Sequence, residues 1–540
     1  MRRVTRFSRA KAVAAVAVLS LAGLSACSSS DSSSSSSSGQ VLTVGTWKGQ
    51  KGQFATIQAA VNAAHQGDWI LVAPGVYKEN NDLTTPIANQ SNGGFGGVLV
   101  STSNLHIRGL SRNGVVIDGT KAGASRCSSN EADQQFGASV NGKAAGRNGI
   151  VVWKANNVSI DNLTVCNFLG GGEQSGNEIW WNGGADTGTM GLKGYSGSYL
   201  TATSTYYGGD TTAATYGLFS SNANGDGGSW NHVYASNFND AGMYIGACKR
   251  YCNITVNDAW MEYSALGYSG TNSGGAIVIQ NSRFDQNKDG FDTNTQINGD
   301  PPAPQDGACP GNEISPITHT HSCWVLQNNI FEDNNNPNVP QAGNASLGPT
   351  GTGMTLSGGR NNTVRNNIFR NNGAWGLLVI PFPDSNDPEM GQSCSGTGGV
   401  ETPGFGCVYD PMNNVISGNT FENNGSFGNP TNGAIGQLAL NANKPANCYS
   451  NNHATGLSGA LKALEVAYPS CGVNRAQADA PGDLLAQVLC DTGFGACPAG
   501  ATYPKVTQVT MHPLPGGLTE MPNPCQGVPN SAWCKNGNLT

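Results

Sequence analysis

The sequence predicts an all-β solenoid, in which short strands wind in stacked coils, and three observations lead to this fold class. An imperfect repeat runs through residues 274–428, where apolar runs alternate with asparagine-rich turns. Within each unit apolar residues recur at every second position, as expected of half-buried strands. Glycine contributes 75 of the 540 residues and only 12% of the residues are charged, which favours turns and stacked strands over charged helices.

The repeat is marked by one phenylalanine in each unit: Phe284, Phe331, Phe369 and Phe421. Three positions earlier stand Asn281, Asn328, Asn366 and, in the fourth unit, Gly418, which Asn419 follows. A unit of roughly 20 to 30 residues cannot bury its apolar face alone, so neighbouring units must stack. We therefore expect asparagine ladders at the turns and a column of phenylalanines inside the coil.

These repeats resemble those of right-handed parallel β-helix proteins of the pectate-lyase-like superfamily, over residues 41–448. Residues 54–80, FATIQAAVNAAHQGDWILVAPGVYKEN, are similar to the start of many such proteins. There the apolar residues Ile57, Ala60, Val61 and Ala64 recur at helical spacing before a strand at 69–72. The resemblance implies a right-handed parallel β-helix over residues 41–450, with an N-terminal capping helix and a Cys-rich C-terminal tail.

Three parts of the chain lack the alternation of the repeat. Residues 121–147 are expected to leave the coil as an excursion, and residues 169–230 are expected to be a long irregular segment whose loops wall a groove. That segment is rich in aromatic residues, including Trp180, Trp181, Tyr206 and Tyr207. Residues 451–540 are rich in Cys, Pro and Gly and are expected to form a disulfide-linked cap over the last coil.

The N-terminus has the features of a secretory signal. Residues 1–26 contain five basic residues, then an apolar run, then Leu-Ser-Ala directly before Cys27. This junction resembles the bacterial lipobox, which implies cleavage before Cys27 and a lipid on its sulfur. Residues 27–40 are mostly serine and are expected to be a flexible tether, so the protein is predicted to be exported and anchored to a membrane through its N-terminal lipid.

Cysteine usage and charge agree with an extracytoplasmic protein. With Cys27 assigned to the lipid, 14 of the 15 cysteines remain, an even number that suits an oxidising compartment. Local spacing makes four disulfides plausible: Cys248–Cys252, Cys394–Cys407, Cys309–Cys323 and Cys490–Cys497. Loss of the five basic residues of the signal lowers the net charge from −7 to −12, and an acidic chain without a basic stripe excludes nucleic acid as a partner.

The strongest candidate site is the acidic stretch at residues 285–294. If Phe291 and Thr293 point inward, alternation puts Asp292 and Asn294 on the outer face. Superposing the coils by their glycines (Gly242, Gly267, Gly290, Gly353 and Gly376) predicts one outward column: Tyr244, Ser269, Asp292, Thr355 and Leu378.

The resemblance implies a polysaccharide bound along such a face. Lyases and epimerases of uronic acids neutralise a carboxylate, often with calcium held by acidic side chains, and present a basic residue. Hydrolases instead need two carboxyl groups, one protonated and one charged. The carboxylates of either mechanism, and the ligands of a calcium site, are expected to be Asp285, Asp289 and Asp292. The catalytic candidates are Asp289, Asp292 and Lys288. The structural alternative is that the three aspartates are turn and solvent-face residues without a catalytic role.

One lyase group of the superfamily carries Asn-x-Asp-Gly-Phe-x-x-Lys, which residues 287–294 match until the last position. Asn294 stands there in place of the lysine, which argues against lyase activity. The sequence lacks the signatures of three other branches of the superfamily: Trp-Ile-Asp-His, Asn-Thr-Asp with Gly-His-Gly, and Asp-Pro-His-Asp.

Other candidates depend on side chains outside this stretch. Tyr244, Asn294, Trp180 and Trp181 are candidates for substrate binding. Aromatic planes such as those of Trp180 and Trp181 pack on the CH faces of sugars, with packing of their loop onto the coil as the alternative. His319 with His321 is a candidate metal pair, with a loop as the alternative, and His232 with Asp240 is a candidate acid/base pair, with a surface histidine as the alternative.

The sequence therefore predicts an exported, lipid-anchored β-helix protein that binds or cleaves an extracellular polysaccharide, in the manner of a lyase or a hydrolase. The alternative is a non-enzymatic protein of the cell surface, such as an adhesin, or a periplasmic accessory protein.

Overall fold

The computed structural model describes residues 39–80, 96–140, 142–171, 175–184, 192–223, 227–246, 248, 251–271, 273–294, 309, 314, 323–383, 399–402, 406–480 and 482–540. Cys27, His319, His321 and Cys394 lie outside these residues. The residues Ser38–Thr540 form one compact unit. No helix in the described residues is both long enough and apolar enough to cross a membrane.

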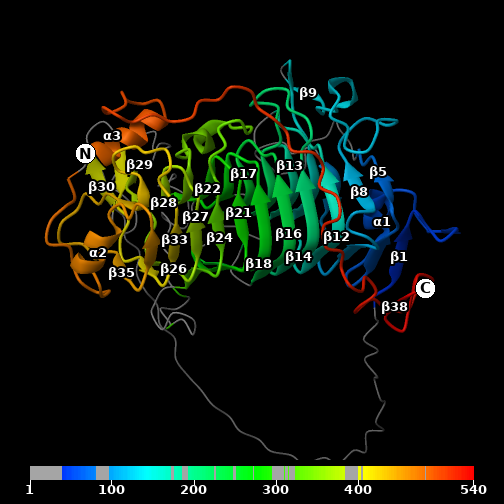
Figure 1. Ribbon diagram of the computed structural model, residues 1–540. Coiled ribbons are helices and arrows are strands. Elements are labelled where there is room, and N and C mark those ends of the chain that lie inside the picture. Colours follow the sequence, from blue (N-terminus) through cyan, green and yellow to red (C-terminus); the bar gives the residue numbers. More distant parts are fainter. Residues whose placement is uncertain are drawn as a thin grey trace, which may run out of the picture. The chain divides into compact units, whose positions relative to one another are not determined.

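The unit is a parallel β-helix, as predicted, in which each coil contributes one strand to a ten-stranded sheet that we call face 1 (Figure 1). Neighbouring strands of face 1 pair in parallel and follow one another in chain order. The strands are β6 (Gly96–Val100), β11 (Asn148–Trp153), β13 (Asn177–Asn182), β15 (Tyr216–Ser221), β17 (Ala241–Gly246), β19 (Leu266–Ser269), β22 (Asp289–Asn294), β25 (Thr352–Ser357), β28 (Trp375–Ile380) and β34 (Gly433–Gln437).

The other strands form a 19-stranded sheet that bends along its length into two further faces. Face 2 contains β1 (Val41–Val44), β4 (Trp69–Val72), β7 (His106–Gly109), β20 (Gly275–Gln280), β23 (Trp324–Gln327), β26 (Asn362–Arg365), β32 (Val415–Ser417) and β35 (Cys448–Ser450). Face 3 contains β5 (Gly75–Tyr77), β8 (Val115–Asp118), β21 (Arg283–Asp285), β24 (Ile330–Glu332), β27 (Ile368–Arg370), β33 (Thr420–Glu422) and β36 (His453–Thr455). Four long strands run through the bend and belong to both faces: β12 (Val158–Cys166), β14 (Tyr195–Thr203), β16 (Gly228–Ser236) and β18 (Tyr251–Glu262).

From β12 onward, the bend between faces 2 and 3 is made by one left-handed residue in each coil. In the repeat these residues are Asn281, Asn328, Asn366 and Gly418, with φ between 53° and 65°. Asparagine and glycine are the residues that adopt this conformation most readily, because other side chains clash with the following carbonyl. The asparagine-rich turns of the sequence therefore mark the corners of the coil.

The interior has the predicted columns. The rings of Phe284, Phe331, Phe369 and Phe421 stack with centroids 4.8–5.1 Å apart and nearly parallel planes. Immediately after the corner residues, Asn329, Asn367, Asn419 and Asn452 form a buried ladder in which each Nδ2 donates to the Oδ1 of the next coil at 3.0–3.1 Å. A second ladder joins Asn287, Asn334, Asn372 and Asn424 at the corner between faces 3 and 1.

The second ladder explains the glycine column of the repeat. A Cβ at Gly290 would lie 2.7 Å from the Nδ2 of Asn334, and a Cβ at Gly353 would lie 2.8 Å from the Nδ2 of Asn372. Both distances are too short for a carbon atom, so the second residue of β22 and of β25 must be glycine where the ladder passes beneath them.

The predicted irregular segment at 169–230 is wrong, because these residues form regular coils that contain β13, β14 and β15. Alternation is hidden there because aromatic residues occupy core positions. The rings of Trp181 and Trp230 lie 5.6 Å apart inside the coil, and Tyr195 packs against both. The excursion at 121–147 contains a short 3₁₀ helix, η1 (Glu131–Asp133), and a hairpin of β9 (Ser139–Val140) and β10 (Lys143–Ala144).

Helices cover both ends of the coil. The helix α1 (Ile57–Ala63) packs Ile57, Ala60 and Val61 on the first coil, as predicted, and Thr56 caps its N-terminus. The helix α2 (Leu461–Ala467) places Leu461 and Leu464 on the last coil. Face 3 continues through β36, so the coil extends past its expected end at residue 450.

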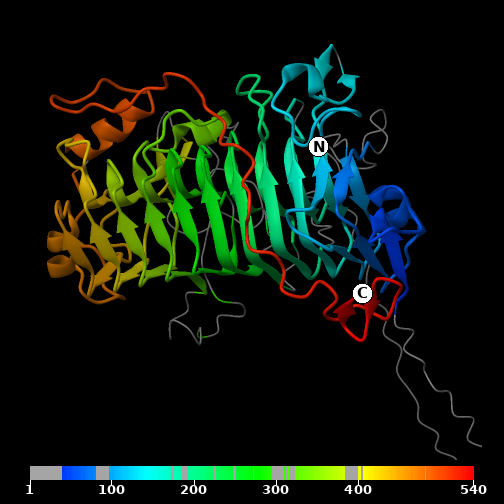
Figure 2. The ribbon, with the colours of Figure 1, turned by 45° about the vertical axis from the view of Figure 1, so that its right-hand side comes forward.

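The C-terminal tail does more than cover the last coil. After α3 (Gly482–Asp491), which packs on the end of face 1, the tail runs back along the solenoid to the first coils (Figures 1 and 2). Along this path His512 N donates to Asn237 and Met521 N donates to Asn162, both of which are left-handed corner residues. At its end Trp533 packs in a small core with residues of β4, near the chain start.

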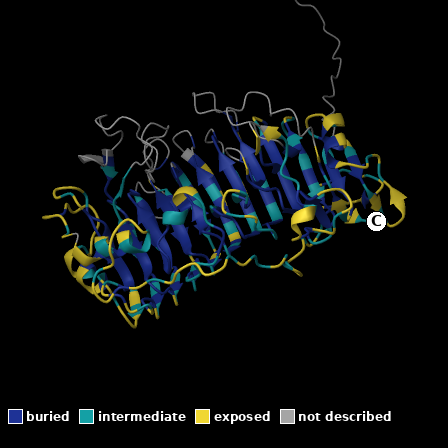
Figure 3. Ribbon diagram, turned by 90° about the horizontal axis from the view of Figure 1, so that it is seen from above, coloured by how far each residue is buried: buried dark blue, intermediate teal, exposed yellow. Residues whose placement is uncertain are grey.

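Three predicted disulfides are present: Cys248–Cys252, Cys309–Cys323 and Cys490–Cys497. Three others join Cys127 to Cys166, Cys448 to Cys471 and Cys525 to Cys534. Seen from above, the strands are mainly buried, and exposed residues gather in the loops and in the tail (Figure 3).

We expect the ladder to be a main source of stability. Asn367→Ala removes an amide that bonds two coils and leaves the Oδ1 of Asn419 without its side-chain donor, so it should lower the free energy of unfolding by about 1–3 kcal/mol. The neighbouring exposed residue Asn366 supplies the control, since glycine adopts its φ of 54° and Asn366→Gly should change stability by less than about 1 kcal/mol. Urea unfolding followed by circular dichroism measures both, and equal losses would contradict a role for the ladder.

Candidate functional site

The outer surface of face 1 carries the predicted column. Register pairs Tyr244 with Ser269, Ser269 with Asp292, Asp292 with Thr355 and Thr355 with Leu378, so this prediction is confirmed. The column continues toward the N-terminus through Phe219 and Trp180. Face 1 therefore presents aromatic residues on its earlier coils and polar residues in its centre, and α3 covers its last coils.

The aromatic residues form a ladder on the outer surface. Trp180 stacks on Phe219 at 5.0 Å and Phe219 on Tyr244 at 4.7 Å, in both cases with planes 12° apart. Tyr216 packs beside this ladder, 5.0 Å from Tyr244. Trp180 is only 2% exposed, whereas Tyr244 is half-buried and is the more accessible end.

Trp181 is the exception among the predicted binding residues. Its side chain points inward and is fully buried in the core, so its assignment to substrate binding is wrong. The physical reason is the alternation of β13, which sends adjacent tryptophans to opposite sides of the sheet.

Asp292 lies at the centre of the column and is 8% exposed. Asn294 Nδ2 donates to its Oδ2 at 2.8 Å, and Ser357 Oγ donates to its Oδ1 at 2.9 Å. Burial raises the pKa of Asp292 to about 6, although both hydrogen bonds act in the opposite direction. Asn294 thus holds the carboxylate of Asp292 in place.

Asp289 starts the same strand and is fully buried. Thr355 Oγ1 donates to its Oδ2 at 2.8 Å and the amide of Phe291 donates to its Oδ1. Burial, followed by the charge of Asp292, raises the pKa of Asp289 well above its usual range. A turn that contains the 3₁₀ helix η3 (Gly343–Leu347) covers this position, since a Cβ at Gly348 would lie 3.2 Å from the Cβ of Asp289.

Lys288 is placed differently from its predicted role as a base. Its side chain is buried, and Nζ donates to the carbonyl of Ser346 in the covering turn at 2.5 Å. Burial lowers the pKa of Lys288, while Asp491 and Asp289 act in the opposite direction. The side chain therefore ties the turn to the coil and is not presented beside Asp292.

Asp240 is a second acidic residue near Asp292. It precedes β17, and Tyr216 donates from its hydroxyl to the Oδ2 of Asp240 at 3.0 Å. Burial raises the pKa of Asp240 to about 7, and the charge of Asp292 adds to this increase. The predicted pairing of Asp240 with His232 is wrong, because His232 lies at the bend between faces 2 and 3 and bonds to Asp258 there.

Asp285 lies on face 3 and does not join Asp289 and Asp292. Trp260 Nε1 donates to its Oδ1 and Arg283 pairs with its Oδ2, both at 2.7 Å. Its neighbours in register are Glu262 and Glu332. The chain turns a corner between Asp285 and Asp289, at Gln286 with φ 56°, so the three predicted calcium ligands do not converge.

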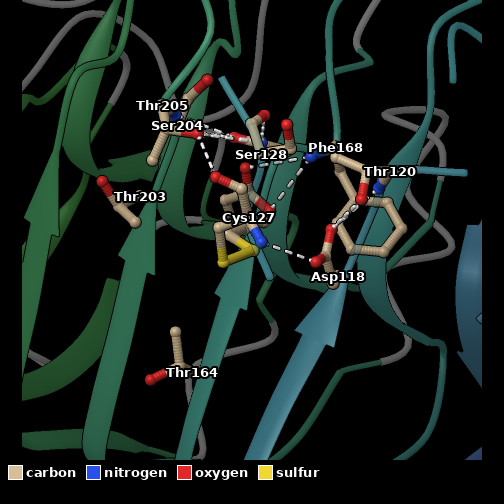
Figure 4. The surroundings of a disulfide bond; sticks show 12 residues. Asp118, Thr120, Cys127, Ser128, Thr164, Phe168, Thr203, Ser204 and Thr205 are labelled. Atoms are coloured by element: carbon tan, nitrogen blue, oxygen red, sulfur yellow. Dashed lines mark hydrogen bonds between the residues drawn. A yellow bond between two sulfur atoms is a disulfide. The ribbon is translucent and has the colours of Figure 1, made fainter. Parts of the chain in front are cut away.

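Only one group of three acidic or sulfur ligands is found among the described residues, and it does not suit a metal. It consists of Asp118, Cys127 and Cys166. The two cysteines form a disulfide, and Asp118 accepts hydrogen bonds from Thr120 and from the amide of Cys127 (Figure 4). Disulfide sulfurs are not thiolate ligands, so this cluster links the excursion to the coil.

Sequence reasoning missed Tyr216 and the outward position of Phe219. Both lie in the segment that was expected to be irregular, so no coil register was available for them. Glu262 was also missed, although its register with Asp285 follows once the coils are aligned.

The geometry defines a β-helix protein with a carboxyl-containing outer face. No protein-family model and no curated protein matches the sequence. The structure is similar to that of the A-module of mannuronan C-5 epimerase AlgE4 from Azotobacter vinelandii, with a TM-score of 0.43 and 13% identity over 74% of this chain and 91% of that one.

Two further solved structures are similar. The alginate lyase from Paenibacillus sp. str. FPU-7 matches with a TM-score of 0.36 and 12% identity, over 78% of this chain and 97% of the lyase. The tailspike protein of E. coli bacteriophage HK620 matches with a TM-score of 0.40 and 12% identity, over 74% of this chain and 59% of the tailspike.

The raised pKa values of the buried carboxyl groups predict a pH dependence of stability. Asp240 and Asp292 titrate higher in the folded protein than in the unfolded chain, so the folded state binds more protons between about pH 4 and pH 7. Their contribution is therefore largest below about pH 4 and is lost as the pH rises to 7. We expect Asp240→Asn to flatten the decline of the melting temperature over this interval.

Thermal unfolding at pH 4, 5, 6, 7 and 8 measures this slope. Glu131→Gln, which alters an exposed side chain of the excursion, is the control and should leave the slope unchanged. A slope that is the same in Asp240→Asn and in the unmodified protein would contradict the raised pKa of Asp240.

Proposed function

We propose that face 1 binds an extracellular polysaccharide and that Asp292 and Asp240 act on it as a base and an acid. The observation that carries this proposal is the column of face 1, which puts an aromatic ladder in register with the carboxylate of Asp292. Aromatic planes bind the CH faces of sugars, and carboxyl groups supply the acid and base that glycosidic chemistry needs.

The ladder supports binding across several coils. Tyr244 and Asp292 are two coil steps apart, roughly 10 Å at the usual strand spacing. A sugar chain that runs along the solenoid axis would contact the aromatic end at Tyr244 and reach Asp292 without bending. The parallel stacking keeps this distance fixed, so the site is preorganised for an extended ligand.

The pKa values support different roles for the two carboxyl groups, with Asp292 as the base and Asp240 as the acid. Burial raises the pKa of Asp292 to about 6 and that of Asp240 to about 7, so Asp292 is the more readily ionised of the two and Asp240 the more readily protonated. Two carboxyl groups whose environments separate their pKa values suit hydrolysis. Elimination would also need a base and a cation, and Lys288 is engaged by Ser346.

A non-enzymatic role is the second candidate, as an adhesin or an accessory protein. Asp289 is fully covered by the turn that contains η3, and Asp292 is only 8% exposed. A face that is covered to this extent could bind a partner or ligand without cleaving it. The three aspartates do not form a common calcium site, because Asp285 lies on another face. We therefore propose calcium only as an ion that bridges the carboxylate of Asp292 and a uronate of the ligand.

We also propose that the protein is exported and attached to a membrane by a lipid on Cys27, with residues 28–38 as a tether. Support comes from the six disulfides in the described residues, which require an oxidising compartment.

A substrate screen tests the enzymatic proposal. The full chain is incubated with polyuronates and with neutral polysaccharides, with and without calcium, while reducing ends and absorbance near roughly 235 nm are followed, since proton abstraction leaves an absorbing unsaturated uronate. We expect new reducing ends without absorbance, and a loss of about 10²–10⁴-fold in Asp292→Asn. Asp258→Asn, at an exposed corner, should keep full activity.

Each outcome of this screen has a clear meaning. A rise in absorbance would replace hydrolysis by elimination. Inactivity on every substrate, together with binding of a polysaccharide in calorimetry that Tyr244→Ala weakens, would favour the non-enzymatic candidate. Inactivity without binding would contradict both roles of face 1.

The lipid anchor predicts a fractionation result. We expect the unmodified protein to sediment with membranes and Cys27→Ala to be released in soluble form, with the mass of the N-terminal peptide reporting the lipid. Ser28→Ala, next to the modified residue, is the control and should remain with the membrane. An unmodified peptide that retains Cys27 and residues 1–26 would contradict the anchor.

A further inference from the structure

A shallow pocket of about 350 Å³ lies on the outer surface of face 2, away from the column of face 1. Four successive strands, β7, β12, β14 and β16, supply side chains to it at one register. These side chains are His106, Ser159, Ser196 and Ser229. Asn157, Tyr195 and the glycines Gly194, Gly227 and Gly228 complete its wall. The polar side chains of the pocket thus offer hydroxyl, amide and imidazole groups.

Ser159 and His106 are in direct contact in this pocket. The Oγ of Ser159 lies 2.8 Å from the Nδ1 of His106, a hydrogen bond in which the hydroxyl donates when Nε2 carries the ring proton. The imidazole is held from its other side by Trp69, whose ring is stacked on it at 4.3 Å and 22°. The stack fixes the imidazole plane, so the hydrogen bond has a defined geometry.

Burial favours the neutral imidazole of His106. It lowers the pKa of His106, and Arg108 on the same strand adds a smaller effect in the same direction. Asp161 opposes this, but its carboxylate is paired with Arg108 at 3.0 Å and also accepts a hydrogen bond from Ser198. A neutral imidazole beside a serine hydroxyl can take up the proton of that hydroxyl.

We propose that Ser159 and His106 are the nucleophile and the base of an esterase site that removes small acyl groups from sugar hydroxyls. Ser159 Oγ attacks the ester carbonyl and its proton moves to Nδ1 of His106. The carbon–oxygen bond to the sugar breaks, and the sugar oxygen receives that proton. Water then attacks the acyl-enzyme with His106 again as base, so that carboxylic acid is released and Ser159 is restored.

Ser196 is placed to assist this step. It pairs in register with Ser159, one strand spacing of roughly 4.8 Å away, and its hydroxyl can donate to the oxyanion of the tetrahedral intermediate. The hydroxyl-lined wall suits a sugar, and the small volume suits a short acyl group such as acetyl better than a long lipid chain. This activity is independent of the proposed chemistry at Asp292, since the two sites lie on different faces.

The test measures ester hydrolysis by the full chain. The substrates are p-nitrophenyl acetate and an acetylated xylan, with released nitrophenol and acetate as readouts, and the protein is also treated with a fluorophosphonate and mapped by mass spectrometry. We expect Ser159→Ala and His106→Asn to lower the rate at least 100-fold, and Ser196→Ala to lower it about 10-fold. The rate should rise with pH to a plateau as His106 loses its proton, with a midpoint below that of an ordinary histidine because burial lowers the pKa of His106.

Thr255→Ala is the matched control, because Thr255 follows Ser229 in register but lies outside the pocket. It should keep its rate within about twofold, and melting temperatures confirm that all variants are folded. A folded Ser159→Ala variant with an unchanged rate would overturn the proposal. So would the combination of no ester hydrolysis on either substrate and no fluorophosphonate on Ser159.

Discussion

The asparagine ladders are the interaction on which the rest of the structure depends. Each buried amide donates both to a backbone carbonyl of one coil and to the Oδ1 of the asparagine in the next. Asn367, for example, bonds to the carbonyl of Leu326 and to Asn419, both at 3.0 Å. An amide without these partners would be costly to bury, so the coils can stack only where the ladders match. The ladders therefore set the register of the coils that contain them, from Asn287 to Asn452.

Register in turn decides which side chains meet on the surface. Because a strand alternates its side chains, a shift by one residue would turn Asp292 and Tyr244 inward and Phe291 outward. The ladder that contains Asn287 and Asn334 lies directly beneath the start of face 1 and requires glycine above it. In each of these coils an outward side chain follows two residues after the glycine, as Asp292 follows Gly290. The packing of the ladder therefore fixes the positions of the side chains in the outward column.

Burial of polar groups gives the faces their chemistry. The turn that contains η3 covers Asp289. Burial also raises the pKa of Asp292 and Asp240 on face 1, and it raises the pKa of Glu262 to about 7 and of Asp285 to about 6 on face 3. On face 3, however, Arg283 pairs with two carboxylates, so those charges form an ion-pair network.

The sequence by itself determined the solenoid, its capping helix and the column from Tyr244 to Leu378. All three depend on local rules: alternation, helical spacing, and the preference of asparagine and glycine for left-handed corners. It also identified three disulfides, because those cysteines are 4, 7 and 14 residues apart and close by in any compact turn.

Only the tertiary structure decided the contents of the site. Asp285 and Asp289 are four residues apart, but a corner at Gln286 sends them to different faces, and no sequence period reports that angle. Lys288 donates a hydrogen bond to the carbonyl of Ser346, which is 58 residues away in the sequence. Tertiary packing places the turn that contains Ser346 over Lys288. The sequence also does not predict the contact between Ser159 and His106, which are 53 residues apart, or the contact of the C-terminal tail with Trp47. Such contacts depend on the number of residues in each coil.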